Sequence, residues 1–181
     1  PALGIEVFHN FSLGHDDIMD EASLRRGQKT IHEKWNTNIA ILSGDAMLVK
    51  AYQYIAQVKA DILPEVLAVF SQTAIEVCEG QQNDMNFESR ESVTEAEYLD
   101  MIRQKTAVLL GGALQIGALI ARSGSDSARS LYSFGVNAGL AFQVQDDLLD
   151  AFGDPAKVGK KAGGDILQDK KTLLMIYART L

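Results

Sequence analysis

The apolar residues of this sequence recur at three- and four-residue spacing, which limits the fold to helices. Val66, Phe70, Val77 and Cys78 form such a stripe behind Pro64, a residue that suits the first turn of a helix. Only 3 prolines occur among 181 residues, and no segment alternates with period two. We therefore predict an all-α fold, an antiparallel helix bundle around a central cavity, with Cys78 in its core.

Single prolines and short Gly, Asn or Ser clusters separate the helical segments, and no repeat or long linker is present. Thr94 followed by Glu97 is a capping-box pattern that begins a helix. The segments 21–36 and 80–93 read as loops. We predict one domain over residues 1–181, with helices at 5–20, 38–59, from Pro64, 94–121, 127–152 and 171–181.

Composition excludes several classes of function. A net charge of −7 provides no basic stripe for nucleic acid. No apolar run approaches the ~20 residues that cross a bilayer, and no signal peptide is visible at Pro1, so we expect no transmembrane segment. The single Cys78 cannot form an internal disulfide, which suits a reducing cytosol. A cytoplasmic location is therefore predicted.

Two acidic segments share one pattern. Residues at i, i+3 and i+4 lie on one helix face, so each segment gathers carboxylates within about one turn. A solvated acidic face explains this poorly, because like charges at four-residue spacing repel by a few tenths of a kcal/mol. Oxygen ligands without His or Cys clusters favour Mg²⁺, or Mn²⁺ or Ca²⁺, over zinc. The carboxylates are Asp16, Asp17 and Asp20 in the first motif and Asp146, Asp147 and Asp150 in the second.

The metal also indicates the substrate class. Mg²⁺ usually takes one or two carboxylates together with substrate phosphate oxygens. Six carboxylates would repel a polyanion unless cations bridged them, so we predict a phosphate ester as substrate. The fold must then bring the two acidic helices face to face across a cavity.

Cationic residues occur where phosphate oxygens would need them. Arg25 and Arg26 follow the first motif, and Lys105 falls in an apolar stripe where a charge is costly unless it meets an anion or reaches solvent. His9 shares a face with Asp16 and Asp20, and Gln143 lies one turn before Asp147. The segment 153–172 indicates a flexible basic lid; its lysines are Lys157, Lys160, Lys161, Lys170 and Lys171.

The motifs resemble those of a known family, the trans (all-E) polyprenyl diphosphate synthases. His15-Asp16-Asp17-Ile18-Met19-Asp20 followed by Leu24-Arg25-Arg26-Gly27 resembles their first aspartate-rich motif. Gly139-Leu140-Ala141-Phe142-Gln143 with Asp146-Asp147-Leu148-Leu149-Asp150 and Gly153-Asp154 resembles their second. Gly80-Gln81 with Asp84, Lys105-Thr106, Gly159-Lys160 and Gly164-Asp165 with Lys170 follow in the family's order.

The resemblance implies a homodimeric, Mg²⁺-dependent prenyltransferase that joins isopentenyl diphosphate to an allylic diphosphate by ionisation, carbocation attack and proton loss. By resemblance, the leading metal ligands would be Asp16, Asp20 and Asp146, with Asp17, Asp147 and Asp150 as ligands or supports. Arg25, Lys105 and Lys160 would grip the allylic diphosphate, Arg26 and His9 would hold isopentenyl diphosphate, and Lys170 would close over both. Gln143, Thr106 and the Lys105 carbonyl would face the carbocation, with Gln81 and Asp84 supporting the wall.

Three further expectations follow from the resemblance. Phe11, five residues before Asp16, suggests a short product, farnesyl or geranylgeranyl diphosphate. The family's upstream Gly-Lys-Arg segment and its later helices are absent from this sequence, so we expect a domain without the N- and C-terminal helices of the complete fold. Two alternatives stay open: a class I terpene cyclase, whose second motif is of Asn/Ser/Glu type, and a noncatalytic regulatory subunit of a synthase.

Overall fold

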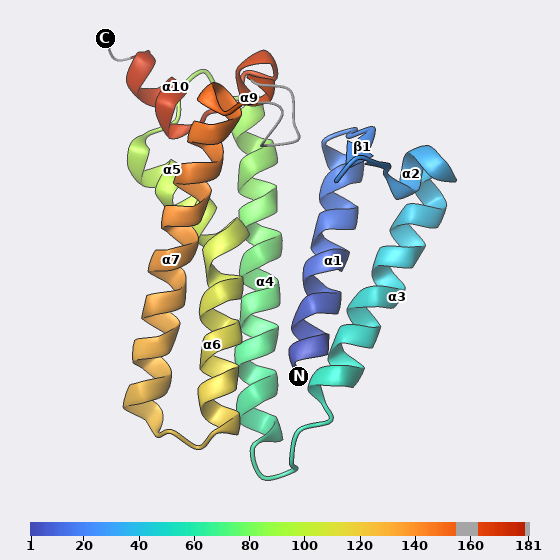
Figure 1. Ribbon diagram of the computed structural model, residues 1–181, viewed down its shortest axis with the longest axis vertical. Helices are drawn as coiled ribbons and strands as arrows, with labels where there is room; N and C mark the ends of the chain where they lie inside the picture. Colours follow the sequence, from blue (N-terminus) through green and yellow to red (C-terminus); the bar gives the residue numbers. More distant parts are fainter. Residues whose placement is uncertain (155–162, 180–181) are drawn as a thin grey trace.

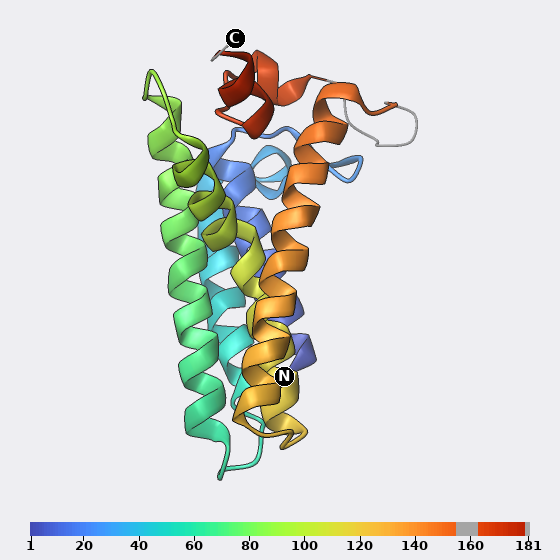
Figure 2. The ribbon, with the colours of Figure 1, turned by 90° about the vertical axis from the view of Figure 1, so that its left-hand side faces the viewer.

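The computed structural model describes residues 1–154 and 163–179, and their regular structure is almost entirely helical. Five long helices lie side by side and alternate in direction (Figures 1 and 2). The predicted all-α antiparallel bundle is thereby confirmed. The long helices are α1 (Ala2–Met19), α3 (Thr37–Ile55), α4 (Leu63–Glu88), α6 (Val108–Ile120) and α7 (Ser125–Phe152).

Shorter elements gather at one end of the bundle, at the top of Figure 1. Among them, η1 is one turn of π-helix between α5 and α6. None of the described helices is long and apolar enough to cross a membrane. The shorter elements are β1 (Leu24–Arg25), β2 (Gln28–Lys29), α2 (Ile31–Lys34), α5 (Glu95–Ile102), η1 (Arg103–Ala107), α9 (Gly164–Leu167) and α10 (Leu173–Ala178).

The segment 21–36, predicted to be a loop, instead contains a hairpin and a helical turn. Leu24 pairs with Lys29 and Arg25 with Gln28 in the antiparallel ladder. The two-residue turn between them has positive φ at both positions, +51° at Arg26 and +75° at Gly27. Such turns match the twist of the flanking strands, and glycine adopts the second position without strain. The hairpin folds the chain back directly after the first acidic motif.

Several helix boundaries shift by a few residues, and α4 and the predicted helix 94–121 differ from the prediction more strongly. α4 continues to Glu88, through a segment predicted to loosen at Gly80. The predicted helix 94–121 begins with the expected capping box of Thr94 and Glu97, but η1 interrupts it. The N–H of Val108 donates to the carbonyl of Arg103, five residues earlier, so one extra residue is accommodated in this turn.

Two apolar clusters hold the bundle together. The larger lies between α1, α3, α4 and α6, where the rings of Phe8 and Phe70 meet edge to face with centroids 5.4 Å apart. The smaller includes Phe87 and Tyr98 and lies under α5, α7 and α10. Cys78, predicted to be buried, is exposed, because its stripe partners Val66 and Val77 face the core and Cys78 falls on the adjacent face. The clusters fix the helices around the ends that carry the acidic motifs.

Candidate active site

The antiparallel topology brings the ends of α1, α4 and α7 to the same end of the bundle (Figure 1). The first acidic motif closes α1, Asp84 lies near the end of α4, and the second motif closes α7. None of these three helices carries a basic residue in its last turn. Helix C-termini bear partial negative charge, and here three of them also carry carboxylates. Cations from other parts of the fold are therefore needed to offset this negative charge.

Lys105 supplies one of these cations. Its Nζ lies 2.7 Å from Asp84 Oδ2 and 3.1 Å from Asp16 Oδ1, so it links α4 to α1. Burial alone would lower the pKa of Lys105, but the charges of Asp16 and Asp84 outweigh burial and raise it. Lys105 therefore pairs with carboxylates, one of the two possibilities that the sequence left open, and it remains charged at neutral pH.

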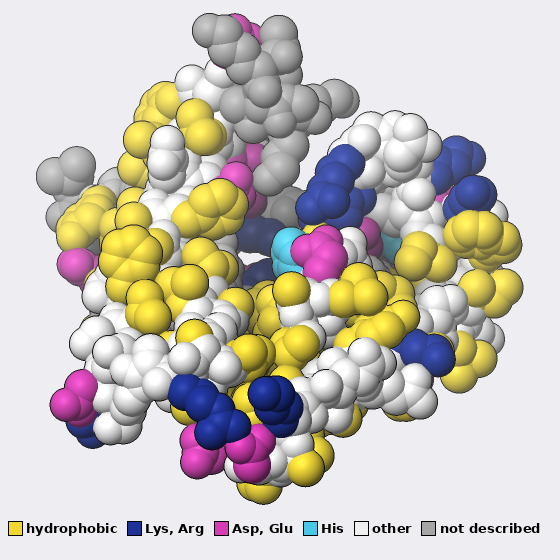
Figure 3. Space-filling model, turned by 60° about the horizontal axis from the view of Figure 1, so that its bottom comes forward, with side chains coloured by type: hydrophobic (Ala, Val, Ile, Leu, Met, Phe, Trp, Pro, Cys, Tyr) yellow, Lys and Arg dark blue, Asp and Glu magenta, His cyan; other side chains and the backbone are white. Residues whose placement is uncertain are grey.

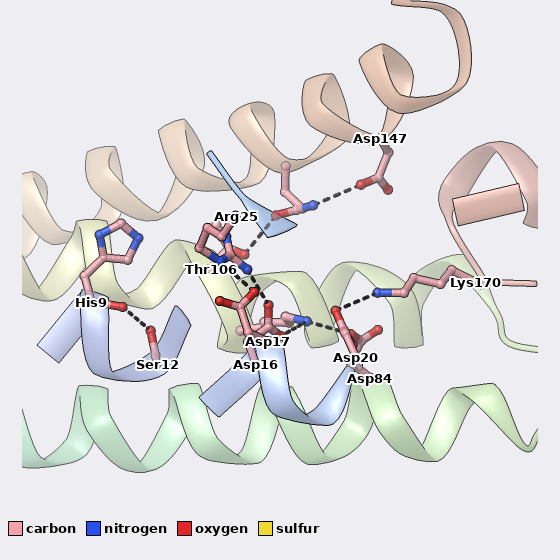
Figure 4. A network of polar contacts seen from close by, with 12 residues as sticks. His9, Ser12, Asp16, Asp17, Asp20, Arg25, Asp84, Thr106, Asp147 and Lys170 are labelled. Atoms are coloured by element: carbon pink, nitrogen blue, oxygen red, sulfur yellow. Dashed lines mark hydrogen bonds and ion pairs between the residues drawn. The ribbon is translucent and has the colours of Figure 1, made fainter. Parts of the chain in front are cut away.

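Arg25 supplies a second cation from the hairpin. Its Nε donates to Asp17 Oδ1 at 2.8 Å, and its Nη2 lies 3.4 Å from Asp16 Oδ2 (Figure 4). Burial raises the pKa of Asp17, and the hydrogen bond from Arg25 offsets part of that rise. Arg25 thus contacts both adjacent carboxylates, Asp17 more closely than Asp16.

Lys170 brings a cation from the far end of the sequence. Its Nζ lies 3.3 Å from Asp20 Oδ2, and the nearby carboxylates of Asp20 and Asp84 raise its pKa against the opposing effect of burial (Figure 4). The segment before it is tied to the second motif, because the N–H of Asp165 donates to Asp150 Oδ2 at 2.9 Å. One short segment therefore contacts both acidic motifs.

A hydrogen-bonded chain joins η1 to α7. Thr106 Oγ1 donates to Gln143 Oε1 at 2.9 Å, and Gln143 Nε2 donates to Asp147 Oδ1 at 2.9 Å. The hydroxyl of Tyr98 donates to Asp147 Oδ2. Burial raises the pKa of Asp147, and the two donors act against that rise. With Lys105 next to Thr106, the first and second motifs are connected through η1.

The π-helical turn explains how η1 reaches both neighbours. A Cβ on Gly80 of α4 would lie 2.2 Å from the backbone nitrogen of Lys105, so only glycine permits this approach. On the other side, a Cβ on Gly139 of α7 would lie 2.5 Å from the Cα of Ala107. π-helical turns occur frequently at functional sites, and here the turn carries both Lys105 and Thr106.

The remaining predicted residues are less closely integrated. His9 and Asp16 lie on the same side of α1, and the His9 carbonyl accepts a bond from Ser12 (Figure 4). Gln81 has a buried Nε2 without an acceptor, which is unusual and fits a ligand oxygen or water. Arg26 is exposed at the hairpin turn. Lys157, Lys160 and Lys161 lie outside the described residues. The described part of the predicted lid contains α9 and the contacts of Lys170 with Asp20 and of Lys171 with Asp169.

The acidic helix ends border open space. A cavity of about 220 Å³ adjoins the second motif, where Asp147, Asp150 and Asp165 meet apolar side chains of α10. From another direction, the surface is hollowed between the two parts of the bundle, and acidic, basic and histidine side chains surround the hollow (Figure 3). The cavity adjoins only the second motif, and the two motifs are connected by the polar contacts of Lys105, Thr106 and Lys170.

The donor set fits a hard divalent cation that a ligand helps to hold. Among the described residues, no three His, Cys, Asp or Glu side chains are close enough to hold a metal ion by themselves. Mg²⁺ does not need such a trio when phosphate oxygens and water complete its coordination. Asp16 Oδ1 is buried and accepts no hydrogen bond, although Lys105 lies beside it as a charge partner. Such an oxygen is suited to a cation.

Tyr98 is the site residue that sequence reasoning missed. It lies two helical turns before Lys105 on the same apolar stripe, and its side chain is 1% exposed. A buried tyrosine hydroxyl usually needs a hydrogen-bond partner. That requirement was the available signal, but the sequence could not identify Asp147 as the partner because 49 residues separate the two.

The fold and the site together define an all-α bundle in which two aspartate-rich helix ends lie at the same end and are connected through η1. The chain belongs to the polyprenyl synthetase family, whose sequence profile matches residues 1–181. It is 43% identical over 181 residues to a geranylgeranyl pyrophosphate synthase of Geoglobus acetivorans, covering 98% of this chain and 56% of that protein.

Solved structures agree with this assignment. The crystal structure of a geranylgeranyl pyrophosphate synthase superposes with a TM-score of 0.94 at 54% identity, covering 97% of this chain and 54% of that chain. A geranyltransferase from Helicobacter pylori, complexed with magnesium and isoprenyl diphosphate, superposes with a TM-score of 0.87 at 29% identity. The match covers 99% of this chain and 63% of that chain. The chain thus spans about half the length of the curated relatives it matches.

Proposed function

We propose that the protein is a trans-prenyltransferase that condenses isopentenyl diphosphate with an allylic diphosphate to give a short trans-prenyl diphosphate. The observation that carries the proposal is the connection between the two acidic motifs. Lys105 contacts Asp16 of the first motif, and the adjacent Thr106 reaches Asp147 of the second through Gln143. One substrate can therefore be held between both motifs.

In this proposal Asp16, Asp20 and Asp146 hold Mg²⁺, and Asp17, Asp147 and Asp150 act as ligands or supports. When bound, Mg²⁺ neutralises the diphosphate and stabilises the charge that grows on it as the allylic carbon–oxygen bond breaks. The magnesium in the related Helicobacter pylori structure supports this choice, and Mn²⁺ is a reasonable substitute.

The basic side chains bind the phosphate oxygens. Arg25, Lys105 and Lys170 are each paired with an aspartate of the site. A diphosphate would offer these side chains charge-assisted hydrogen bonds in place of those to the aspartates, whose carboxylates would then be available to hold Mg²⁺. By resemblance, Lys160 joins Arg25 and Lys105 on the allylic diphosphate, and His9 and Arg26 bind isopentenyl diphosphate.

The carbocation needs oxygen dipoles and a dry pocket, because water would otherwise capture it. Thr106 and Gln143 present such oxygens beside the carbonyl of Lys105 in η1. Gln81 and Asp84 form the wall behind them. The released diphosphate is the proposed base for the final proton loss, because the carboxylates of this site are engaged with cations or hydrogen-bond donors.

Three further proposals concern the whole protein. The family resemblance supports a homodimer, and the single cysteine suits the cytoplasm. Relatives that are geranylgeranyl pyrophosphate synthases support a short product.

The decisive experiment is incubation of the complete natural polypeptide with Mg²⁺, isopentenyl diphosphate and a panel of allylic diphosphates. A longer diphosphate is the expected product. Release of a hydrocarbon would instead indicate a terpene cyclase, and inactivity that a partner subunit relieves would indicate a regulatory subunit. The relatives, which are synthases, favour neither alternative.

A further inference from the structure

Both carboxylate oxygens of Asp147 accept hydrogen bonds from other side chains. Oδ2 accepts from the Tyr98 hydroxyl, and Oδ1 accepts from Gln143 Nε2 at 2.9 Å. Asp147 is 7% exposed and Tyr98 is 1% exposed. This is a buried polar contact at the edge of an apolar cluster, where each donor and acceptor must be matched.

The donor and acceptor roles in this series of hydrogen bonds fix the orientation of the Gln143 amide. An ionised carboxylate only accepts hydrogen bonds, so Gln143 turns its NH₂ group to Asp147. The amide oxygen then points to Thr106, whose hydroxyl donates to it at 2.9 Å. The single hydroxyl proton of Thr106 is used in that bond. Gln143 and Thr106 therefore offer oxygen lone pairs to the adjacent space.

We propose that Tyr98 is a positioning residue for prenyl transfer, acting through Asp147 to keep the Gln143 and Thr106 oxygens turned toward the allylic cation. The inference rests on the proposed function. Without the Tyr98 hydroxyl, the Asp147 carboxylate can turn away from Gln143. The Gln143 amide can then rotate by 180° and present its N–H groups to the cation, which repels them. Burial and the contact with Asp147 raise the pKa of Tyr98, so its hydroxyl keeps its proton at neutral pH.

The test compares Tyr98→Phe with Tyr52→Phe in the complete natural polypeptide. Tyr52 is a matched control, because its hydroxyl lies 3.1 Å from Ser71 in the other apolar cluster, away from the site. We expect Tyr98→Phe to lower kcat by roughly ten- to a hundredfold, the effect of losing one charge-assisted hydrogen bond. KM for both diphosphates should stay within about twofold, because Arg25, Lys105 and Lys170 are unchanged.

A binding measurement separates positioning from general damage. One probe is an allylic diphosphate analogue with a protonated amine at the reacting carbon, and the other is an uncharged, unreactive allylic analogue. Tyr98→Phe should weaken the binding of the amine analogue by about tenfold or more and change the affinity for the uncharged analogue by no more than about twofold. Equal weakening of both analogues, or behaviour identical to Tyr52→Phe, would overturn the inference.

Asp147→Asn gives a second, independent test. The Tyr98 hydroxyl would hold the new amide oxygen, so the new NH₂ group would face Gln143 and invert its amide. We expect a larger loss of kcat than in Tyr98→Phe, and the double variant should fall no further, because both changes break one chain of contacts. Additive losses would contradict a role through Asp147. If the natural protein itself condenses no substrate, the proposed function fails instead.

Discussion

Lys105 lies between carboxylates from two different helices, and its removal would leave those charges facing each other. Its side chain is 24% exposed, and its ammonium is within 3.1 Å of both Asp16 and Asp84. Removing one partner from a buried ion pair is costly because the remaining charge keeps its desolvation penalty. The lysine therefore has a structural role in addition to the proposed grip on diphosphate.

Lys105→Met should lower the free energy of unfolding at pH 7 by about 3 kcal/mol. Urea denaturation measures this change, and the exposed Lys50 on α3 provides a control. Lys50→Met should change stability by less than about 0.5 kcal/mol. Equal effects of the two substitutions would mean that the contacts of Lys105 contribute little.

Phe11 tests the proposed control of product length. It is 7% exposed and packs against the rings of Phe8 and His15. Phe11→Ala should lengthen the prenyl product by opening space ahead of Asp16, and should cost about 3 kcal/mol of stability. Chromatography of the products checks the first effect, with Phe134→Ala, an exposed site on α7, as the control. An unchanged product distribution would remove Phe11 from this role.

At this scale, chemistry that depends on spacing along one helix could be predicted, but partners across the fold could not. The sequence placed Asp16 and Asp20 on one face and indicated that Lys105 needed either an anion or access to solvent. It did not show that Asp84 and Asp16 would share that lysine, or that Asp150 would bind the backbone of Asp165. Those contacts join residues that tertiary packing brings together.

The π-helical turn η1 is the element on which the site is built. It is held between α4 and α7 by two close approaches, at Gly80 and at Gly139. Any shift of η1 moves Lys105 and Thr106 together, because both residues lie in this turn. Displacements near 1 Å can reduce catalysis strongly.

Gly80→Ala should therefore impair both stability and activity. The new Cβ would meet the backbone of Lys105 at 2.2 Å, so η1 must shift. We expect a loss of about 1 to 3 kcal/mol and a fall in kcat/KM of about tenfold or more.

Gly117→Ala in α6 is the matched control for that substitution. A Cβ at Gly117 meets nothing within 4 Å, and alanine favours a helix over glycine, so stability should rise by about 0.5 to 1 kcal/mol. Full activity in Gly80→Ala, measured beside this control, would show that η1 tolerates displacement.

Helix periodicity predicted the long elements well, but it could not reveal local irregularities. The capping box at Thr94 marked the start of α5 correctly. Gly80 suggested a break, yet it permits close packing within an unbroken α4. The hairpin at residues 24–29 has only two residues per strand, too few for an alternating pattern to be visible.

The charges of the whole site should make stability depend on alkaline pH. The pKa of Lys105 and of Lys170 is raised above the ordinary lysine value of 10.5, and that of Tyr98 above 10.0. The folded protein therefore keeps protons that the unfolded chain has already lost. The stabilisation is complete below about pH 10 and is lost as pH rises through the raised values.

Unfolding in urea at pH 8, 9.5, 10.5 and 11 measures this dependence. We expect the free energy of unfolding to fall above about pH 10, by up to about 1.4 kcal/mol per pH unit for each group. Lys105→Met should show a shallower fall, because one of the three groups is gone. An identical slope in the natural protein and the variant would contradict the raised pKa of Lys105.

The arrangement of the whole bundle could be inferred only in part. Because successive long helices alternate in direction, the first and the fifth of them, which carry the two acidic motifs, end at the same end of the bundle. Two acidic motifs that bind one metal-bearing substrate must also meet. The sequence could not show that α4 would bring Asp84 to the same place, or that the segment with Lys170 would contact Asp20. Both depend on how the loops direct the chain.

The extra residue in η1 has a consequence for how this chain can vary. Each residue rotates an α-helix by about 100°, so α5 and α6 would face different neighbours if the turn held one residue fewer. Tyr98 and Met101 on α5 pack in one cluster, and Val108 and Ile116 on α6 pack in the other. If a single residue between 103 and 107 were deleted, either α5 or α6 would lose its packing in its apolar cluster. Single-residue deletions should consequently be far less tolerated here than in the exposed loop near Gly124.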